Sequence, residues 1–283
     1  MGKNRYDRQI LAFGEGGQER IAAIRVGIVG LGGLGSHIAQ GLAYLGVKEY
    51  ILVDDDRVEV TNLNRLVGAF PKDVDTGMFK VDVAERMIKM ITPDSIVTSV
   101  MQNLRSQDAI DALVTCPVIF GCVDHDAPRL ILMELSAAYE ITLIDCATEI
   151  IIENGCLQEF GGRIVVARPG DFCLDCAGQI NMEVAKEELE TPRIRELRKK
   201  HGYGLGEKVK APAIISLNGV VANIAITEFI CMATGIREPN RQLTYHGERG
   251  IVNSRKDKRR DDCFTCGYLK GKEDAANIKR YIV

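Results

Sequence analysis

The stretch Arg25-Val-Gly-Ile-Val-Gly-Leu-Gly-Gly-Leu-Gly35 decides the fold of this chain. A short β-branched run breaks into glycines and continues in the helical pattern Ser36 to Leu45, which predicts a strand, a tight turn and a helix. Such a turn directs backbone N–H groups and a helix N-terminus at one place, where they favour a phosphate. Asp54 ends the next apolar strand, where a carboxylate can accept hydrogen bonds from ribose hydroxyls. The predicted nucleotide-binding residues are Gly30, Gly32, Gly33, Leu34, Gly35 and Asp54.

The composition is that of an ordinary globular protein. The 283 residues contain 46% hydrophobic and 27% charged side chains, which suffices for a sizeable core. The net charge of −3 gives no reason to expect nucleic acid or an anionic membrane as a partner. The N-terminus lacks the apolar core of a signal peptide, and we expect no apolar run to reach the ~18 residues of a membrane span. We therefore expect a cytoplasmic protein.

From Arg25 onward, short apolar segments alternate with amphipathic ones. This rhythm predicts a Rossmann-like, doubly wound, mostly parallel sheet with helices on both faces. The expected strands are residues 25–30, 49–54, 96–100, 117–121 and 141–145, and the expected helices lie near 34–45, 78–91, 106–113 and 127–138.

After Asp145 the pattern indicates antiparallel strands. Two apolar runs around Asn154-Gly155 and Gly161-Gly162 predict hairpins, a long apolar helix follows at 213–234, and strands are expected at 241–246 and 250–254. We therefore expect a single domain over residues 1–283. Its parts are an N-terminal helical arm (1–24), a nucleotide-binding half (25–147) and a half with antiparallel strands (148–283) that contains a crossover loop (177–212).

Charged residues after the second strand distinguish this chain from an ordinary dinucleotide dehydrogenase. A triphosphate needs more cations than a diphosphate bridge does, and Arg65 and Lys80 supply a planar fork and a compact point charge. Asp56 or Asp124 could hold Mg²⁺, which uses one or two carboxylates together with phosphates. Asp54 and Asp124 each follow a strand, so we expect them to converge at the carboxyl edge of the sheet.

Nine cysteines in a chain of this length argue against a disulfide scaffold. Cys173/Cys176 and Cys263/Cys266 form two Cys-x-x-Cys pairs, whose four thiolates suit tetrahedral Zn²⁺. A single pair would fit a redox site or chance. The other cysteines are expected to be small buried hydrophobes: Cys116, Cys122, Cys146, Cys156 and Cys231.

In this order the motifs resemble the ThiF/MoeB/HesA family, the bacterial relatives of ubiquitin-activating enzymes. The resemblance covers nearly all of residues 4–268. The matching pieces are Arg5-Tyr-Asp-Arg8-Gln, Gly30-Leu-Gly-Gly-Leu-Gly35, Asp54-Asp-Asp56, Asn62-Leu-Asn-Arg65, Lys80, Asp124 and both Cys-x-x-Cys pairs. One departure is Leu66, where relatives often carry glutamine; it leaves the main set intact.

The resemblance implies ATP-dependent adenylation of a C-terminal carboxylate, usually the Gly-Gly end of a ubiquitin-like or sulfur-carrier protein, with release of pyrophosphate. It implies that Asp54 binds the ribose and that Asp124 positions Mg²⁺. The residues that it assigns to the phosphates are Asn62, Arg65 and Lys80. Arg8 is implied to reach the site of a partner subunit, which makes the protein a homodimer. With the family match, structural Zn²⁺ becomes the favoured role of the paired cysteines.

Relatives that pass the activated carrier onward as a thioester or persulfide keep a cysteine in the crossover loop. Residues 177–212 contain none, and Thr191 is a poor substitute for a thiolate, so we predict an enzyme that only adenylates. One alternative is a thioester on another cysteine: Cys122, Cys146, Cys156 or Cys231. A second is an NAD-linked oxidoreductase, and a third is a scaffold that only binds nucleotide. Thiamin or molybdopterin sulfur transfer, peptide-antibiotic maturation and ubiquitin-like conjugation remain open as pathways.

Overall fold

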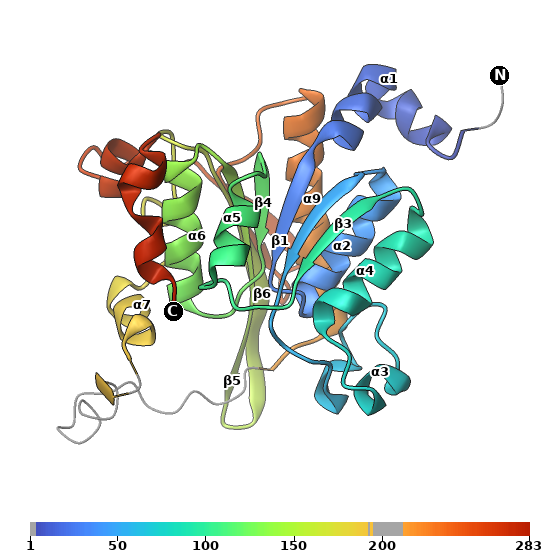
Figure 1. Ribbon diagram of the computed structural model, residues 1–283, viewed down its shortest axis with the longest axis horizontal. Helices are drawn as coiled ribbons and strands as arrows, with labels where there is room; N and C mark the ends of the chain where they lie inside the picture. The colour runs from blue at the N-terminus through green and yellow to red at the C-terminus, as the bar shows by residue number, and fades with distance from the viewer. Residues whose placement is uncertain (1–3, 192, 195–211) are drawn as a thin grey trace.

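Strand β1 (Arg25–Val29) lies in the parallel part of the sheet between β2 (Glu49–Val53) and β4 (Val118–Gly121) (Figure 1). The computed structural model describes residues 4–191, 193–194 and 212–283, and orders the strands β3-β2-β1-β4-β5-β6-β7-β8. The first five strands of this order are parallel and the last three antiparallel. The predicted doubly wound sheet with an antiparallel extension is confirmed. The remaining strands are β3 (Ile96–Val100), β5 (Thr142–Glu153), β6 (Cys156–Ala167), β7 (Gln242–His246) and β8 (Ile251–Arg255).

Helices cover both faces of the parallel part (Figure 1). The described α-helices are α1 (Asp7–Ala23), α2 (Gly33–Leu45), α3 (Pro71–Asp75), α4 (Lys80–Ile91), α5 (Gln107–Leu113), α6 (Asp126–Ala138), α7 (Met182–Leu189) and α9 (Ile215–Thr234). One core lies between the sheet and α2, α4 and α9, and the other between the sheet and α5 and α6. Successive residues of β4 point into opposite cores. Ile119 belongs to the core beneath α5 and α6, and Phe120 to the core beneath α2, α4 and α9.

Helix α9 is long and apolar enough to cross a membrane by length and composition, and it is the one such helix among the described residues. Half of this apolar stretch is buried inside the protein. Leu217, Val221 and Ala225, spaced four residues apart, are all buried, and the helix contacts α1, α2, β5 and β6. This packing is that of a core helix.

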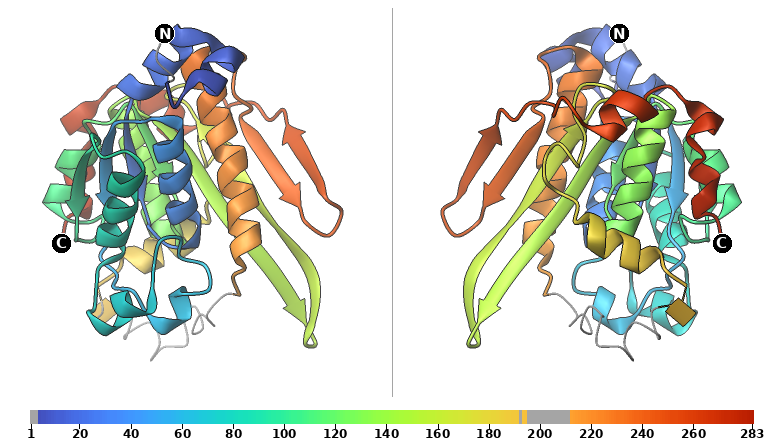
Figure 2. Two further views of the ribbon diagram at one scale, coloured as in Figure 1. Left: turned by 90° about the vertical axis from the view of Figure 1, so that its right-hand side faces the viewer. Right: turned by 90° about the vertical axis from the view of Figure 1, so that its left-hand side faces the viewer.

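The hairpin at Asn154-Gly155 is confirmed, because both residues have the positive φ angles of a tight two-residue turn between β5 and β6. The second hairpin, expected at Gly161-Gly162, is wrong: both glycines lie inside β6. Figure 2 shows β5 and β6 as two long neighbouring strands. A Cβ on Gly162 would stand 2.5 Å from Val221 of α9, and one on Gly161 would stand 2.2 Å from the carbonyl oxygen of Tyr245. These glycines therefore allow close packing, which a sequence does not distinguish from a turn.

A buried carboxylate stabilises the end of α9. Glu228 is 2% exposed and accepts hydrogen bonds from the Arg237 guanidinium and from the Asn240 backbone N–H. Burial alone would raise the pKa of Glu228, but these hydrogen bonds outweigh it and hold the pKa below its ordinary value of 4.5. A lowered pKa means that the folded state is stabilised above the unfolded-state pKa and loses this stabilisation as the pH falls.

We expect Glu228→Gln to lower the free energy of unfolding at pH 7 by about 2 kcal/mol, a value reduced by the partial exposure of Arg237. Denaturant titration should show this difference in full above pH 4.5 and show it shrinking as the pH falls through the folded-state pKa. Glu238→Gln, which alters an exposed pair with Arg168, is the matched control and should change stability little. Equal effects of the two substitutions would contradict the role of Glu228.

Candidate active site

The glycine turn after β1 is built on two close backbone approaches. Gly30 has φ +87° and donates its N–H to the Val53 carbonyl oxygen at 3.0 Å; a Cβ there would lie 2.6 Å from the Cys122 carbonyl oxygen. A Cβ on Gly35 would lie 1.9 Å from the Gly30 carbonyl oxygen. Gly32 precedes the first residue of α2 and has open space where its Cβ would point. The turn therefore leaves the head of α2 accessible at the carboxyl edge of the sheet.

Asp54 ties the second strand to this turn. Its carboxylate accepts a hydrogen bond from the Leu31 N–H at 2.6 Å and another from the Asp56 N–H at 2.9 Å. Burial raises the pKa of Asp54, while the charge of Lys80 and the two backbone N–H groups oppose the rise. The predicted ribose ligand thus stands beside the glycine turn.

Of the two predicted phosphate cations, Lys80 contacts the acidic segment and Arg65 lies near the head of α2. Lys80 begins α4, and its Nζ forms an ion pair with Asp56 Oδ2 at 2.5 Å while its own backbone N–H bonds the Asp56 carbonyl oxygen. Arg65 donates to the Thr61 carbonyl oxygen at 2.5 Å and to Asn64 Oδ1 at 3.1 Å. Its Cδ lies 3.5 Å from the point where a Cβ on Gly33 would stand, so Arg65 reaches the head of α2.

Asn62 and Leu66 shape the segment that presents Arg65. Asn62 Oδ1 accepts a hydrogen bond from the Glu59 backbone N–H at 3.0 Å. The backbone carbonyl oxygen of Asn62 accepts the N–H groups of Arg65 and Leu66. Leu66 is buried in a small cluster with Val58. In this structure Asn62 therefore organises the turn, and the departure at Leu66 serves packing.

The expected convergence of Asp54 and Asp124 is met only in part. Both residues follow strands at the carboxyl edge of the sheet, but their side chains do not form one group. Cys122 donates its N–H to the Val29 carbonyl oxygen at 2.8 Å, so the segment after β4 runs beside the glycine turn. The Asp124 side chain, however, is 93% exposed and lies 3.7 Å from His125 Nε2. The acidic group whose oxygens lie within 4.8 Å of one another consists of Asp54, Asp55 and Asp56. Asp55 is a residue that the sequence reasoning did not single out.

Helix α1, which carries Arg8, lies at the C-terminal end of α2, away from the glycine turn (Figure 1). Arg8 is an exposed residue of α1, whose Gln18 bonds the Leu45 carbonyl oxygen at the C-terminal end of α2. The 13 residues of α2 separate that end from Gly33 by about 20 Å. Within one chain Arg8 does not meet the glycine turn.

The paired cysteines come together as one cluster beside α6, which contacts the segment that contains Cys266. All four Sγ atoms lie within 4.8 Å of one another, with Cys173 and Cys263 3.6 Å apart and Cys176 and Cys266 3.9 Å apart. Burial raises the pKa of Cys263 to about 12, so the uncharged thiol is favoured unless a cation offsets the burial. The Cys176 sulfur accepts the Arg260 N–H and the Cys263 sulfur the Cys266 N–H. This donor set could hold one metal ion.

The other cysteines are mostly enclosed, as expected. The neighbouring Cys122 thiol and burial raise the pKa of Cys146 well above its ordinary value, and burial raises that of Cys116 to about 11. Burial also raises the pKa of Cys231. Cys156 is the exception, since it is exposed beside the β5–β6 turn.

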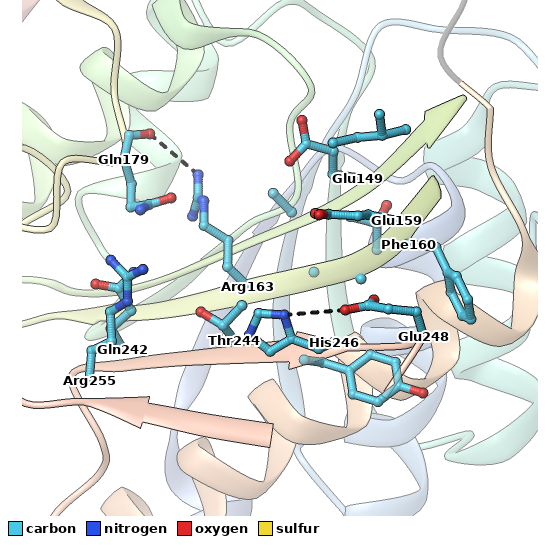
Figure 3. Close-up of a pocket in the computed structure, with 16 residues that line it drawn as sticks. Glu149, Glu159, Phe160, Arg163, Gln179, Gln242, Thr244, His246, Glu248 and Arg255 are labelled. Atoms are coloured by element: carbon cyan, nitrogen blue, oxygen red, sulfur yellow. Dashed lines mark hydrogen bonds and ion pairs between the residues drawn. The ribbon is translucent and has the colours of Figure 1, made fainter. Parts of the chain in front are cut away.

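A separate pocket of about 260 Å³ lies over the antiparallel strands (Figure 3). Arg163 points across it toward the Gln179 carbonyl oxygen and pairs with the fully buried Asp145. His246 faces Glu248 at 3.8 Å, and the Oε1 atom of Gln242 is buried without a hydrogen-bond partner among the described residues. No motif in the sequence marked this pocket, because its residues come from four strands and two loops.

Comparison with known proteins settles the family. The ThiF family model matches residues 6–265. This chain belongs to the ThiF family. It is similar to the sulfur carrier protein ThiS adenylyltransferase of Escherichia coli, with 29% identity over 93% of this chain and 94% of that protein. It is 33% identical to ubiquitin-like modifier-activating enzyme 5 of Drosophila mojavensis over 81% of this chain, but spans only 55% of that longer relative.

The fold has close counterparts among solved structures. The crystal structure of E. coli MccB with ATP superposes with a TM-score of 0.71, covering 94% of this chain and 75% of MccB at 21% identity. MccB with the peptide MccA gives a TM-score of 0.72. The expected family and enzyme class are therefore confirmed, and the relatives are named for adenylation or activation rather than for redox chemistry.

The two glycines at the turn should respond differently to a methyl group. Gly35→Ala places a Cβ against the Gly30 carbonyl oxygen, so we expect it to lower the free energy of unfolding by about 1–3 kcal/mol. Gly32→Ala places its Cβ in open space and should leave stability within about 0.5 kcal/mol. Chemical denaturation measures both. A Gly35→Ala protein as stable as the Gly32→Ala protein would show that the turn is not built on this contact.

Proposed function

We propose that this chain is an ATP-dependent adenylyltransferase that activates a C-terminal carboxylate and releases pyrophosphate. The acceptor is a small ubiquitin-like or sulfur-carrier protein ending in Gly-Gly, or a peptide. The observation that carries the proposal is the arrangement of Arg65 and Lys80 around the head of α2 beside Asp54. A full-length match to a ThiS adenylyltransferase supports it.

In this proposal Asp54 accepts the ribose hydroxyls, and Arg65 and Lys80 neutralise the phosphates while Asn62 holds their loop in place. Lys80 exchanges its ion pair with Asp56 for a phosphate oxygen. Arg65 likewise exchanges its hydrogen bonds to the Thr61 carbonyl oxygen and Asn64 Oδ1 for phosphate oxygens. The attacking carboxylate is already ionised at neutral pH, so no general base is needed. Catalysis then consists of alignment and of charge stabilisation at the α-phosphate.

Mg²⁺ fits the carboxylates that follow β2 and β4. Its ligands would come from Asp56 and Asp124, together with phosphate oxygens, because hard cations prefer such oxygen donors. When bound, the ion would supply positive charge to the phosphates. The exposed carboxylate of Asp124 is free to turn toward the glycine turn, which its own segment adjoins.

The acceptor is proposed to approach over the open face of β5–β8. The pocket there reaches Thr148, and Thr148 Oγ1 lies 3.3 Å from Asn218, which adjoins Gly33 at the head of α2. A chain of neighbouring residues thus links the polar pocket to the proposed α-phosphate position. The protein fits this scheme as a single ThiF-type adenylation domain in the cytoplasm.

A homodimer is proposed because Arg8 lies far from its own glycine turn. In a two-fold dimer, the exposed α1 of one subunit can bring Arg8 to the phosphates of the other. The Cys-x-x-Cys cluster is proposed to bind structural Zn²⁺, since four thiolates close its tetrahedral shell and leave no position for chemistry.

The enzyme is proposed to stop at the adenylate. The crossover loop carries no cysteine, although residues 192 and 195–211 of this loop lie outside the described part of the structure. The buried thiols of Cys146, Cys116 and Cys231 have raised pKa values, which disfavours the nucleophilic thiolate.

We expect Asp124→Ala to lower carrier-dependent ATP–pyrophosphate exchange by about 100-fold, because the metal-bound phosphates lose a ligand. The control is Asp94→Asn, an exposed carboxylate paired with Lys48 on the surface, which should leave exchange unchanged. Normal exchange by the Asp124→Ala protein would refute its role, and absence of exchange in the unaltered enzyme would favour the NAD-linked or scaffold alternatives. A thiol-sensitive carrier adduct on a non-reducing gel would contradict adenylation alone and point to Cys122, Cys146, Cys156 or Cys231.

The purified protein should contain about one zinc per chain by mass spectrometry. Cys263→Ser is expected to remove the metal and to lower the free energy of unfolding by about 3–4 kcal/mol, because ligand binding to the folded state alone stabilises it. Cys156→Ser, at an exposed thiol outside the cluster, should retain both metal and stability. Zinc retained by the Cys263→Ser protein would exclude the four-cysteine site.

A further inference from the structure

Asn218 brings an unpaired amide to the head of α2. Asn218 is 3% exposed, and its Nδ2 atom is buried without a hydrogen-bond partner among the described residues. The Oδ1 atom accepts a hydrogen bond from Thr148 Oγ1 at 3.3 Å, which fixes the side chain between α9 and β5. A buried amide N–H that lacks an acceptor is unfavourable, so its presence calls for a functional explanation.

The position of this amide coincides with the start of α2. A Cβ on Gly33 would stand 2.1 Å from Asn218 Nδ2 and 3.5 Å from Arg65 Cδ. Only glycine at this position lets the side chain from α9 approach the first helical turn. The amide of Asn218 and the side chain of Arg65 therefore flank the same point.

The head of α2 offers further donors without an internal acceptor. The helix has 13 residues, no side-chain cap and no acidic residue in its first turn. The first N–H groups of a helix have no partner within the helix, and an anion satisfies them. An orphan side-chain donor and uncapped backbone donors thus meet at one place, where a negatively charged oxygen would satisfy both.

We propose that Asn218 is a phosphate-binding residue whose Nδ2 donates a hydrogen bond to an oxygen of the nucleotide α-phosphate. The assignment rests on the proposed function. It adds a neutral donor from α9 to the cations Arg65 and Lys80. Thr148 acts as a positioning residue, because its hydroxyl holds Oδ1 and so turns Nδ2 toward Gly33.

The test compares the binding of AMP and adenosine by calorimetry in the full-length protein. Asn218→Asp keeps the shape of the side chain but replaces the donor with a negative charge. We expect it to weaken AMP binding about tenfold or more while adenosine binding stays within about twofold, since only AMP carries the phosphate. The control is Asn223→Asp, exposed on the same helix with its Nδ2 bonded to the Gly219 carbonyl oxygen, which should change neither affinity.

The ratio of the two affinities separates the possible roles of Asn218. A parallel loss of AMP and adenosine binding would indicate a structural role for Asn218. Unchanged affinities for both ligands would show that the amide does not bind the phosphate. Either result overturns the proposal. A change confined to the KM for the carrier would assign the amide to the acceptor carboxylate instead and also overturn it. If Asn218→Asp does not fold, Asn218→Ala is read in its place, with an expected loss of about fivefold for AMP alone.

Failure of the proposed function gives a different result. An unaltered protein that binds neither AMP nor ATP would refute the adenylyltransferase proposal and this assignment with it. An unaltered protein that exchanges pyrophosphate, together with an Asn218→Asp protein of unchanged AMP-to-adenosine ratio, would refute only the role of Asn218.

Discussion

The contact between Gly35 and the Gly30 carbonyl oxygen is the constraint on which the site depends. Because no side chain fits between them, α2 begins directly behind the end of β1, and its uncapped first turn faces the carboxyl edge of the sheet. The Leu31 N–H then reaches Asp54, which joins the turn to the second strand. A larger residue at position 35 would move the helix, and with it every group that the helix positions relative to Asp54.

The charges around this turn are satisfied internally in the described structure. Lys80 pairs with Asp56, and Arg65 bonds the backbone of its own loop. Asp56 and Asn64 are exposed and can be exchanged, whereas the pair of Arg163 with the fully buried Asp145 is enclosed. Exchange of one carboxylate for a phosphate costs little electrostatically, since the cation keeps an anionic partner throughout. In the proposed function, the nucleotide would therefore enter a site whose cations are already in position.

Sequence patterns predicted the elements well because the local and long-range signals agree. Asn154-Gly155 has the φ angles that its turn requires, and alternating residues of β4 serve two cores. Gly161 and Gly162 misled the prediction because glycine marks both turns and close packing, and only the position of α9 distinguishes them. Asn218 carried no signal at all, since its relation to Gly33 exists only once α9 packs beside α2. Asp124 was predicted at the correct edge of the sheet. The direction of its side chain depends on spatial neighbours that the sequence does not identify.

Arg8 and the glycine turn lie at opposite ends of α2, so Arg8 cannot add its charge to the proposed phosphate site of its own chain. A side chain spans a few ångströms, while α2 alone separates the two by about 20 Å, so no rotamer of Arg8 closes the distance within one chain. The Gln18 bond to Leu45 and the Arg20 bond to the Ala233 carbonyl oxygen hold α1 against the ends of α2 and α9. Movement of the arm toward its own site would break these contacts. In the proposed homodimer the second subunit would supply Arg8 instead, so the anchoring of α1 favours assembly over closure as the way to add a further cation to the proposed phosphate site.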